Sequence, residues 1–396
     1  MEQKKIRALI TYIEAGMGHI VTADAIADAL EAKYGDRFEV IRDYTLRDSE
    51  KPVLPRYEKF LVGQVKNYSR FPGYCSLQML FMHLGGSKNN LRFVHNVVFH
   101  RATKATIEEF IKKKPDCIVS THFFQLFAAC EYRNKYDPNC KVILYCPDNT
   151  LHGWWDNRVD RIYTNNSLAT ADARRYRFPE ESICEVFYPT REAVSSASGT
   201  KKEYRGMFGI PQDKFAVVIA DGMYAKAKAR KVTMELLKSD LPLTVCVIAG
   251  KNEKLKAELD AMKDKVKPNI TLIPMGFVKD APQLYAACDL FITKAGPNAI
   301  LDSVLMGTPI LTNYYATPIE KQTMRLFVKE KKCGYHIKSM KKIREKVEAL
   351  IADRSELDAM KEHLAFFDKT KNGAVEIADD MAAMYGIAVK EEVSPV

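Results

Sequence analysis

The chain has 396 residues, of which 47% are hydrophobic and 28% charged, with a formal net charge of +10. This composition excludes disordered and fibrous proteins, and the length predicts two domains. The N-terminus has no signal-peptide pattern and no apolar run reaches about 18 residues, so we expect a cytoplasmic protein.

The first predicted strand, residues 6–12, leads through a turn at Gly16 and Gly18 into a helix with an apolar face over residues 23–30. Glycines at such a turn permit positive φ and let a ligand approach the first helical amides. The spacing GMGH differs from the Gly-x-Gly-x-x-Gly of dinucleotide enzymes, which disfavours a nicotinamide cofactor. His19 is either a structural residue of a tight turn or part of a ligand site.

Most of the positive charge lies between Lys51 and Lys114, where twelve Lys or Arg face three acidic residues. The same segment is rich in aromatic residues. These are Tyr57, Phe60, Tyr68, Phe71, Tyr74, Phe81, Phe93 and Phe99. This mixture is typical of membrane-surface and nucleic-acid-binding segments, and composition does not separate the two. A solvated face with its aromatic residues in the core is the third alternative.

Further strand patterns alternate with helix patterns along the rest of the chain. They cover residues 117–123, 141–146, 215–220, 243–250, 290–296 and 309–314. This alternation predicts doubly wound parallel sheets. The small polar stretch 195–202 is the predicted linker. The nine cysteines form no Cys-x-x-Cys pair and several lie inside these patterns, so we expect buried free thiols and no zinc site.

Residues 275–322 follow the order strand end, helix, strand, Gly-Pro turn, helix, glycine stop and strand. Gly296 and Pro297 open the second of these helices. The first amides of that helix, near Asn298 and Ala299, suit an anion such as a diphosphate, because the helix dipole adds to their attraction.

Two charged residues flank this helix start. Asp302, one turn inside the helix, suits a ribose diol, and Lys294, just before the turn, suits a phosphate. Taken singly, each has a structural alternative: an acid favoured near a helix N-terminus, and a solvated loop lysine.

Three stretches together resemble GT-B glycosyltransferases that use UDP-sugars and act on lipids. They are EAGMGH at 14–19, ADGMYAKAKARKVTMELL at 220–237 and GFVKDAPQLYAACDLFITKAGPNAILDSVLMGTPIL at 276–311. The most similar groups are the processive diacylglycerol glucosyltransferases and the monogalactosyldiacylglycerol synthases, and the lipid II N-acetylglucosaminyltransferase is more distant. The resemblance extends from about residue 6 to residue 385.

The resemblance implies an α/β protein of two Rossmann-like domains whose parallel sheets face each other across a cleft. Residues 1–198, joined by a C-terminal helix at about 375–396, would form the acceptor domain, and residues 199–374 the UDP-sugar domain. The implied enzyme is an inverting hexosyltransferase of glycolipid biosynthesis that needs no cofactor and no metal. The chain agrees in having no Asp-x-Asp pair.

The implied partners are a UDP-sugar, a diacylglycerol-type lipid and an anionic membrane surface, without nucleic acid. The protein would be peripheral on the inner face of the cell membrane. The hexose, the number of sugars added and the oligomeric state are left open. Two alternatives remain: a non-catalytic descendant that binds a nucleotide sugar or a lipid, and a UDP-sugar enzyme with a soluble substrate, such as an epimerase.

Carried onto this sequence, the resemblance makes His19 the catalytic base, in a loop with Gly16, Met17 and Gly18. Imidazole suits the role because it exchanges protons near neutral pH. Asp148, which follows a central strand, orients His19 or replaces it as base. His152 and Trp154 are expected to line the acceptor site, although ordinary packing explains the tryptophan equally well.

The implied donor-binding residues come from the second half of the chain. They are Gly222, Gly250, Phe277, Val278, Lys294, Gly296, Asn298, Ala299, Asp302, Glu320 and Lys321. Three departures from the family pattern fall among or beside them. Pro297 replaces a glycine and removes one amide donor, Asp302 replaces a glutamate, and residues 319–321 replace Gly-Gln-Glu.

Overall fold

The computed structural model describes residues 4–13, 17–70, 88–222, 227–315 and 317–390. The chain divides into an N-terminal unit of residues 1–191 and 371–396 and a C-terminal unit of residues 192–370. The boundaries expected from the sequence lie a few residues further along the chain. Residues 192–195 form a short helix with Val194 buried, so the polar stretch 195–202 lies inside the C-terminal unit and does not join the two units.

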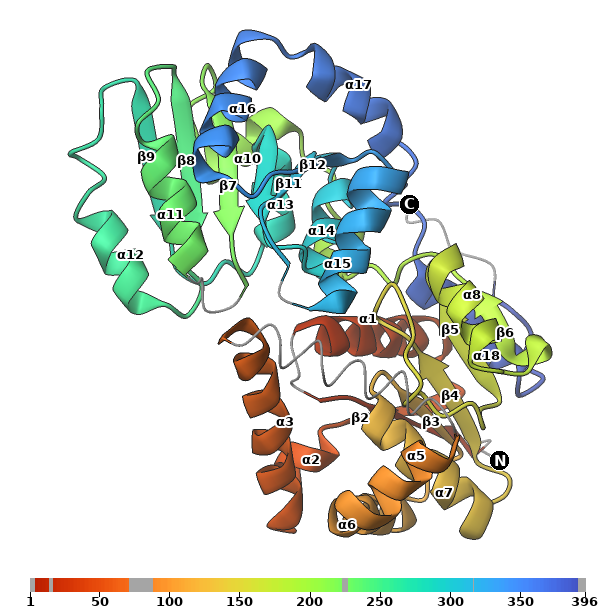
Figure 1. Ribbon diagram of the computed structural model, residues 1–396. Helices are drawn as coiled ribbons and strands as arrows, with labels where there is room; N and C mark the ends of the chain where they lie inside the picture. The colour runs from red at the N-terminus through yellow and green to blue at the C-terminus, as the bar shows by residue number, and fades with distance from the viewer. Residues whose placement is uncertain (1–3, 14–16, 71–87, 223–226, 316, 391–396) are drawn as a thin grey trace. The chain divides into compact units, whose positions relative to one another are not determined.

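The described part of the N-terminal unit contains a parallel sheet in the order β2-β1-β3-β4-β5-β6 (Figure 1). Its strands are β1 Ile6–Thr11, β2 Phe38–Asp43, β3 Cys117–Ser120, β4 Lys141–Tyr145, β5 Arg161–Thr164 and β6 Ile183–Glu185. Its helices are α1 Met17–Tyr34, α2 Thr45–Asp48, α3 Val53–Arg70, α5 Lys88–Phe93, η1 Val94–Val98, α6 His100–Lys113, α7 Phe123–Lys135, α8 Ser167–Arg175, η2 Glu180–Ser182 and α18 Gly373–Ala383.

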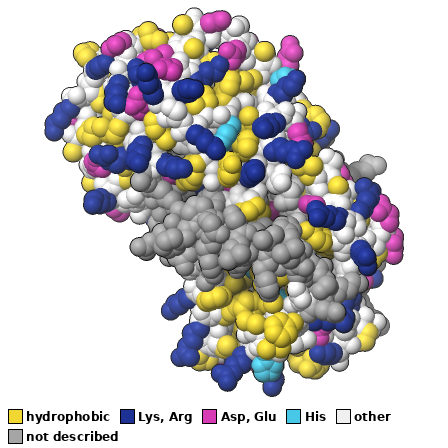
Figure 2. Space-filling model, in the orientation of Figure 1, with side chains coloured by type: hydrophobic (Ala, Val, Ile, Leu, Met, Phe, Trp, Pro, Cys, Tyr) yellow, Lys and Arg dark blue, Asp and Glu magenta, His cyan; other side chains and the backbone are white. Residues whose placement is uncertain are grey.

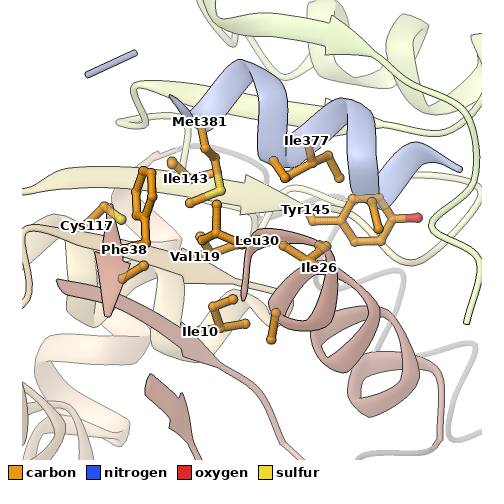
Figure 3. Packing of buried hydrophobic residues seen from close by; sticks show 14 of the residues in the cluster. Ile10, Ile26, Leu30, Phe38, Cys117, Val119, Ile143, Tyr145, Ile377 and Met381 are labelled. Carbon is orange, nitrogen blue, oxygen red and sulfur yellow. The ribbon is translucent and has the colours of Figure 1, made fainter. Parts of the chain in front are cut away.

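Side chains that alternate along β1 fill cores on both faces of this sheet. Ile10 packs in the core formed with α1 and α18, and Leu9 packs in the core formed with α6, α7 and α8. Figure 3 shows the first core, in which Ile26 of α1 and Met381 of α18 belong to one cluster of buried side chains with Ile10 of β1. Helix α18 therefore belongs to the N-terminal unit although it lies near the end of the chain.

The start of α18 depends on a glycine. A Cβ atom at Gly373 would lie 1.8 Å from the carbonyl oxygen of Phe187. Further along the helix, Asp379 accepts a hydrogen bond from the Tyr34 hydroxyl at 2.7 Å, and Asp380 accepts one from the Tyr163 hydroxyl at 2.7 Å. These contacts fix the helix against β5 and against the end of α1.

The described part of the C-terminal unit contains a second parallel sheet in the order β12-β11-β10-β7-β8-β9. Its strands are β7 Phe215–Ala220, β8 Leu243–Ile248, β9 Ile270–Met275, β10 Leu290–Thr293, β11 Ile310–Thr312 and β12 Gly334–His336. Its helices are α9 Glu192–Ser195, α10 Lys201–Met207, α11 Ala227–Leu236, α12 Glu253–Asp260, α13 Ala281–Ala287, α14 Pro297–Leu305, α15 Pro318–Met324, η3 Arg325–Glu330, α16 Met340–Ala352 and α17 Ser355–Leu364.

The central strands of this sheet are buried along their whole length, as continuous apolar runs in parallel sheets usually are. Helices cover both faces of the sheet (Figure 1). One face packs against α11, α12, α16 and α17. All eight cysteines that the structure describes are free, and seven of them are buried, as the sequence predicts. Within the described ranges, no helix is both long enough and apolar enough to cross a bilayer.

Candidate functional site

The N-terminal unit has a topological switch point between β1 and β3. The chain runs from β1 to β2 on one side and then places β3 on the other side of β1. Ligands of open parallel sheets bind beyond the carboxyl ends of the strands at such a point. Helix α1 begins there at Met17, and Thr121 directly follows β3.

The sequence predicts a turn at Gly16 and Gly18, but Gly18 already belongs to the first turn of α1. The Thr22 hydroxyl donates a hydrogen bond to the Gly18 carbonyl at 2.8 Å, inside the helix. His19 therefore projects from a helical turn and not from a preceding loop. Gly16 lies outside the described residues.

His19 is held by the backbone of the neighbouring strand end. Its Nδ1 lies 2.6 Å from the Thr121 carbonyl oxygen. Because a carbonyl only accepts, Nδ1 carries the hydrogen, and a neutral ring then has its lone pair on Nε2. In return, the Thr121 hydroxyl donates to the His19 carbonyl at 3.2 Å. The contact fixes the tautomer that a general base with its lone pair on Nε2 requires.

A second histidine lies beside the first. The rings of His19 and His122 are 5.2 Å apart and meet edge to face. His122 caps α7, because its Nδ1 accepts a hydrogen bond from the Phe124 amide at 3.3 Å. Burial, followed by the charges of His19 and His152, lowers the pKa of His122 well below its ordinary value. His122 is therefore neutral at physiological pH.

The other predicted acceptor-side residues lie near this cluster. Phe123 contacts His122 with ring centroids 4.3 Å apart, His152 at 5.5 Å and Trp154 at 5.7 Å. Trp154 is only 6% exposed and packs in a small apolar core. Asp148 is half-buried in the turn after β4, and its carbonyl accepts a hydrogen bond from Cys146 Sγ at 3.5 Å. The partner that orients Nδ1 of His19 is thus a backbone carbonyl.

The C-terminal unit has its own switch point, between β7 and β10. Gly222, just after β7, adopts a φ of +73°, and a Cβ atom there would lie 3.5 Å from Cε of Lys294. Gly296 lies equally close to the same side chain, with its Cβ position 3.6 Å from Cε. The structure therefore brings together three of the predicted donor-binding residues.

Lys294 forms an ion pair with Glu320, its Nζ 2.6 Å from Oε1. The Glu320 side chain is only 9% exposed, and its backbone amide donates the capping hydrogen bond to the Thr317 hydroxyl at the start of α15. Removing one partner of such an enclosed pair leaves a buried charge uncompensated. The pair thus fixes the end of the lysine side chain at the switch point, beside the start of α14.

Helix α14 begins at Pro297, directly after Gly296 at the N-cap position, as the sequence predicts. Its first-turn amides include those of Asn298 and Ala299. The amide of Ile300 donates a hydrogen bond to the Gly296 carbonyl at 3.2 Å. Amides at such a position and the helix dipole favour a bound anion. Asp302 follows in the same helix and is half-buried.

The remaining predicted donor residues lie around the ends of β8 and β9 and on α15. Gly250, with a φ of +60°, donates from its amide to the Gly276 carbonyl at 3.2 Å. Phe277 is 64% exposed and Val278 is partly exposed. Lys321 is exposed on α15. Among the residues described, no group of His, Cys, Asp and Glu side chains is arranged to hold a metal ion.

A polar cluster beside Lys294 was not expected from the sequence. The Tyr314 hydroxyl donates to a carboxylate oxygen of Asp221, and the Lys228 Nζ lies 3.6 Å from the centre of the Tyr314 ring. Burial lowers the pKa of Lys228. In the N-terminal unit, Thr121 and His122 were also missed. Four of these residues, Thr121, His122, Asp221 and Tyr314, follow the carboxyl end of a strand, which is the signal available in the sequence.

Comparisons with known proteins show that this chain is similar to glycosyltransferases. Residues 203–364 match the family "Glycosyl transferases group 1". Monogalactosyldiacylglycerol synthase 1 of Arabidopsis thaliana is 26% identical over 351 residues, which are 85% of this chain and 63% of that protein. The processive diacylglycerol beta-glucosyltransferase of Bacillus licheniformis is 22% identical over 94% of this chain and 93% of its own. The match to the plant relative covers less than two thirds of the length of that protein.

Among solved structures, HepE of Anabaena in complex with UDP has a TM-score of 0.54 at 13% identity, and the match covers 97% of this chain and 100% of that one. The two parallel sheets are those of the GT-B fold, so the predicted fold class is confirmed. The resemblance to diacylglycerol glycosyltransferases is confirmed as well.

Proposed function

We propose that the chain transfers a hexose from a UDP-sugar to the hydroxyl of a diacylglycerol-type lipid, with inversion and without a metal or cofactor. The observation that carries the proposal is the group 1 glycosyltransferase match over residues 203–364, a range that contains Lys294 and the start of α14 at a sheet switch point. The names of both curated relatives point to the lipid, and the complex of HepE points to UDP.

In the proposed mechanism, Nε2 of His19 takes the proton of the lipid hydroxyl as its oxygen attacks the anomeric carbon. Attack opposite to the leaving group inverts that carbon, and the bond to the UDP oxygen breaks. The Thr121 carbonyl supports this role because it holds the other ring nitrogen as a donor. Asp148 is the alternative base.

The departing UDP carries the charge that develops in the reaction. The amides at the start of α14 and the ammonium group of Lys294 are preorganised donors for a diphosphate, and such groups stabilise developing charge without reorganisation. Glu320 holds Lys294 in place when no phosphate is bound. Asp302 is proposed to accept hydrogen bonds from the ribose.

We also propose that the N-terminal unit docks on an anionic membrane through α3, η1 and α6, at the inner face of the cell membrane. Phe60, Phe93, Val97 and Val98 are 50–62% exposed on these elements or on the adjoining α5. A groove of about 380 Å³ between Val53 and Ala102 includes Arg56 and Arg101 in its lining. Figure 2 shows apolar side chains with Lys and Arg around them on this part of the unit.

The positive charge of this surface is smaller than the sequence suggests. Lys51 is paired with Glu108, and Lys113 with Asp43. Tyr57 is buried, so part of the aromatic content belongs to the core. Residues 71–87 and several side chains before them, among them Lys66 and Arg70, lie outside the described structure.

Vesicle sedimentation tests the docking proposal. Binding should rise with the share of anionic lipid and fall with salt, because each cation near the surface contributes about 1 kcal/mol. The double variant Arg56→Glu/Arg101→Glu should bind at least about thirtyfold more weakly. Arg175→Glu/Arg177→Glu, on α8 and the turn after it, is the matched control and should bind like wild type. Equal binding of the two variants, or of neutral and anionic vesicles, would contradict the proposal.

A transfer assay tests the proposed reaction and separates it from its alternatives. The protein is incubated with UDP-glucose, UDP-galactose or UDP-N-acetylglucosamine labelled in the sugar, together with diacylglycerol vesicles and EDTA. Label in the organic phase from one of these donors is the expected result. Label in a water-soluble product would indicate a soluble substrate, and intact donor in all three reactions would indicate a binding protein without turnover.

A further inference from the structure

A basic pocket lies at the amino ends of the strands of the C-terminal unit. Its volume is about 400 Å³, and it is lined by α10, α17 and the segments before β10 and β11. Five basic side chains and two carboxylates contribute to it. The basic residues are Lys201, Lys202, Arg205, Arg354 and Lys361.

The buried carboxylate of this pocket is already fully engaged. Asp289 accepts hydrogen bonds at Oδ2 from Arg205 at 2.8 Å and from the Ala216 amide at 2.8 Å, and its Oδ1 accepts one from Lys201 at 2.7 Å. Arg205 is buried and donates from Nε and Nη1 to backbone carbonyls, so this pair forms the floor of the pocket. Asp289 has little capacity left to balance a further cation.

The rim of the pocket carries the excess charge. Arg354 is 53% exposed, and its Nη1 is 3.5 Å from the engaged Oδ1 of Asp289. Lys202 is exposed on α10. Lys361 has a carboxylate of its own, because its Nζ lies 2.6 Å from Asp358. A concave surface with an excess of positive charge concentrates anions.

We propose that this pocket binds a phosphate group through Lys202 and Arg354. The phosphate belongs either to a soluble phosphomonoester or to a lipid headgroup. Lysine and arginine are the side chains that form charge-assisted hydrogen bonds with phosphate. A phosphate between them connects α10, near the start of the C-terminal unit, with α17, near its end.

This site is separate from the donor residues. Asp289 directly precedes β10 and Lys294 directly follows it. Five steps along a strand at about 3.3 Å each place the two residues roughly 16 Å apart, at opposite ends of β10. The proposal therefore does not depend on the proposed function, and the two are separable by mutation.

The test compares probes and variants of the full chain at constant ionic strength set with chloride. Inorganic phosphate and glycerol 3-phosphate are titrated by calorimetry, and vesicles of phosphatidic acid in phosphatidylcholine are used in sedimentation. Lys202→Gln/Arg354→Gln should bind at least about tenfold more weakly than wild type, because it removes two charge-assisted contacts. Lys254→Gln/Lys263→Gln, also on the surface of the C-terminal unit, is the matched control.

If Lys202→Gln/Arg354→Gln lost glycerol 3-phosphate binding and the control variant kept it, the result would support a pocket that binds a soluble phosphomonoester. Loss that is confined to the vesicles would support it with a lipid headgroup. The proposal would be overturned if wild type bound none of the probes, if both variants bound like wild type, or if the phosphate binding were lost in Lys294→Gln instead. Circular dichroism of each variant verifies that the fold is retained.

Discussion

Replacing His19 by alanine is expected to lower turnover in the transfer assay by roughly 10²–10⁴, the usual effect of removing a general base. Nδ1 of His19 is bound to the Thr121 carbonyl at 2.6 Å, which leaves Nε2 to accept a proton from the acceptor hydroxyl. The affinity for UDP should not change, because the proposed donor residues all belong to the C-terminal unit.

A matched control tests whether removal of any histidine from the chain lowers turnover. His363→Ala changes an exposed histidine of α17 and should retain full turnover. If His19→Ala also retained full turnover, the histidine would be a structural part of the first turn of α1. The base would then have to be found elsewhere, and Asp148 would be tested next.

The second large effect is expected for Asp302→Ala. UDP at about 100 times its dissociation constant should stabilise the wild-type chain by roughly 2.7 kcal/mol, which thermal unfolding detects. Because we assign the ribose contact to Asp302 in α14, the variant should lose this stabilisation. Asp264→Ala, an exposed carboxylate of the same unit, is the control and should keep it. An unchanged shift in Asp302→Ala would contradict the assignment.

Most strands inside the two sheets could be predicted from the sequence, whereas several strands at the sheet edges could not. The expected strands at 6–12, 117–123, 141–146, 215–220 and 243–250 correspond to β1, β3, β4, β7 and β8. Strands β2, β6 and β12 were not expected, and they are edge strands. Solvent reaches one side of an edge, so these strands carry charged or partly exposed residues and lack a continuous apolar run. Strand β5 lies inside the sheet and was missed because its sequence, RIYT, starts with a charged residue, ends with a polar one and contains no apolar run.

The parts of the candidate site that depend on neighbouring residues in the sequence could be predicted. The helix start at Gly296 and Pro297 follows from the turn residues alone. The contact between His19 and Thr121 joins residues 102 positions apart through a backbone carbonyl, and no side-chain pattern encodes it. The ion pair of Lys294 with Glu320 likewise exists only once β10 and α15 are packed. Such contacts depend on the order of the strands in the sheet, and this order cannot be read from a single sequence.

Calorimetric titration of the wild-type protein with UDP tests the proposed UDP-sugar-dependent reaction, because that reaction requires a UDP site on the chain. We expect saturable binding of one UDP per chain, with micromolar to millimolar affinity, and no such binding by Asp302→Ala. A wild-type titration without binding at millimolar UDP would contradict the proposed reaction, because the start of α14 and Lys294 would then not form a nucleotide site.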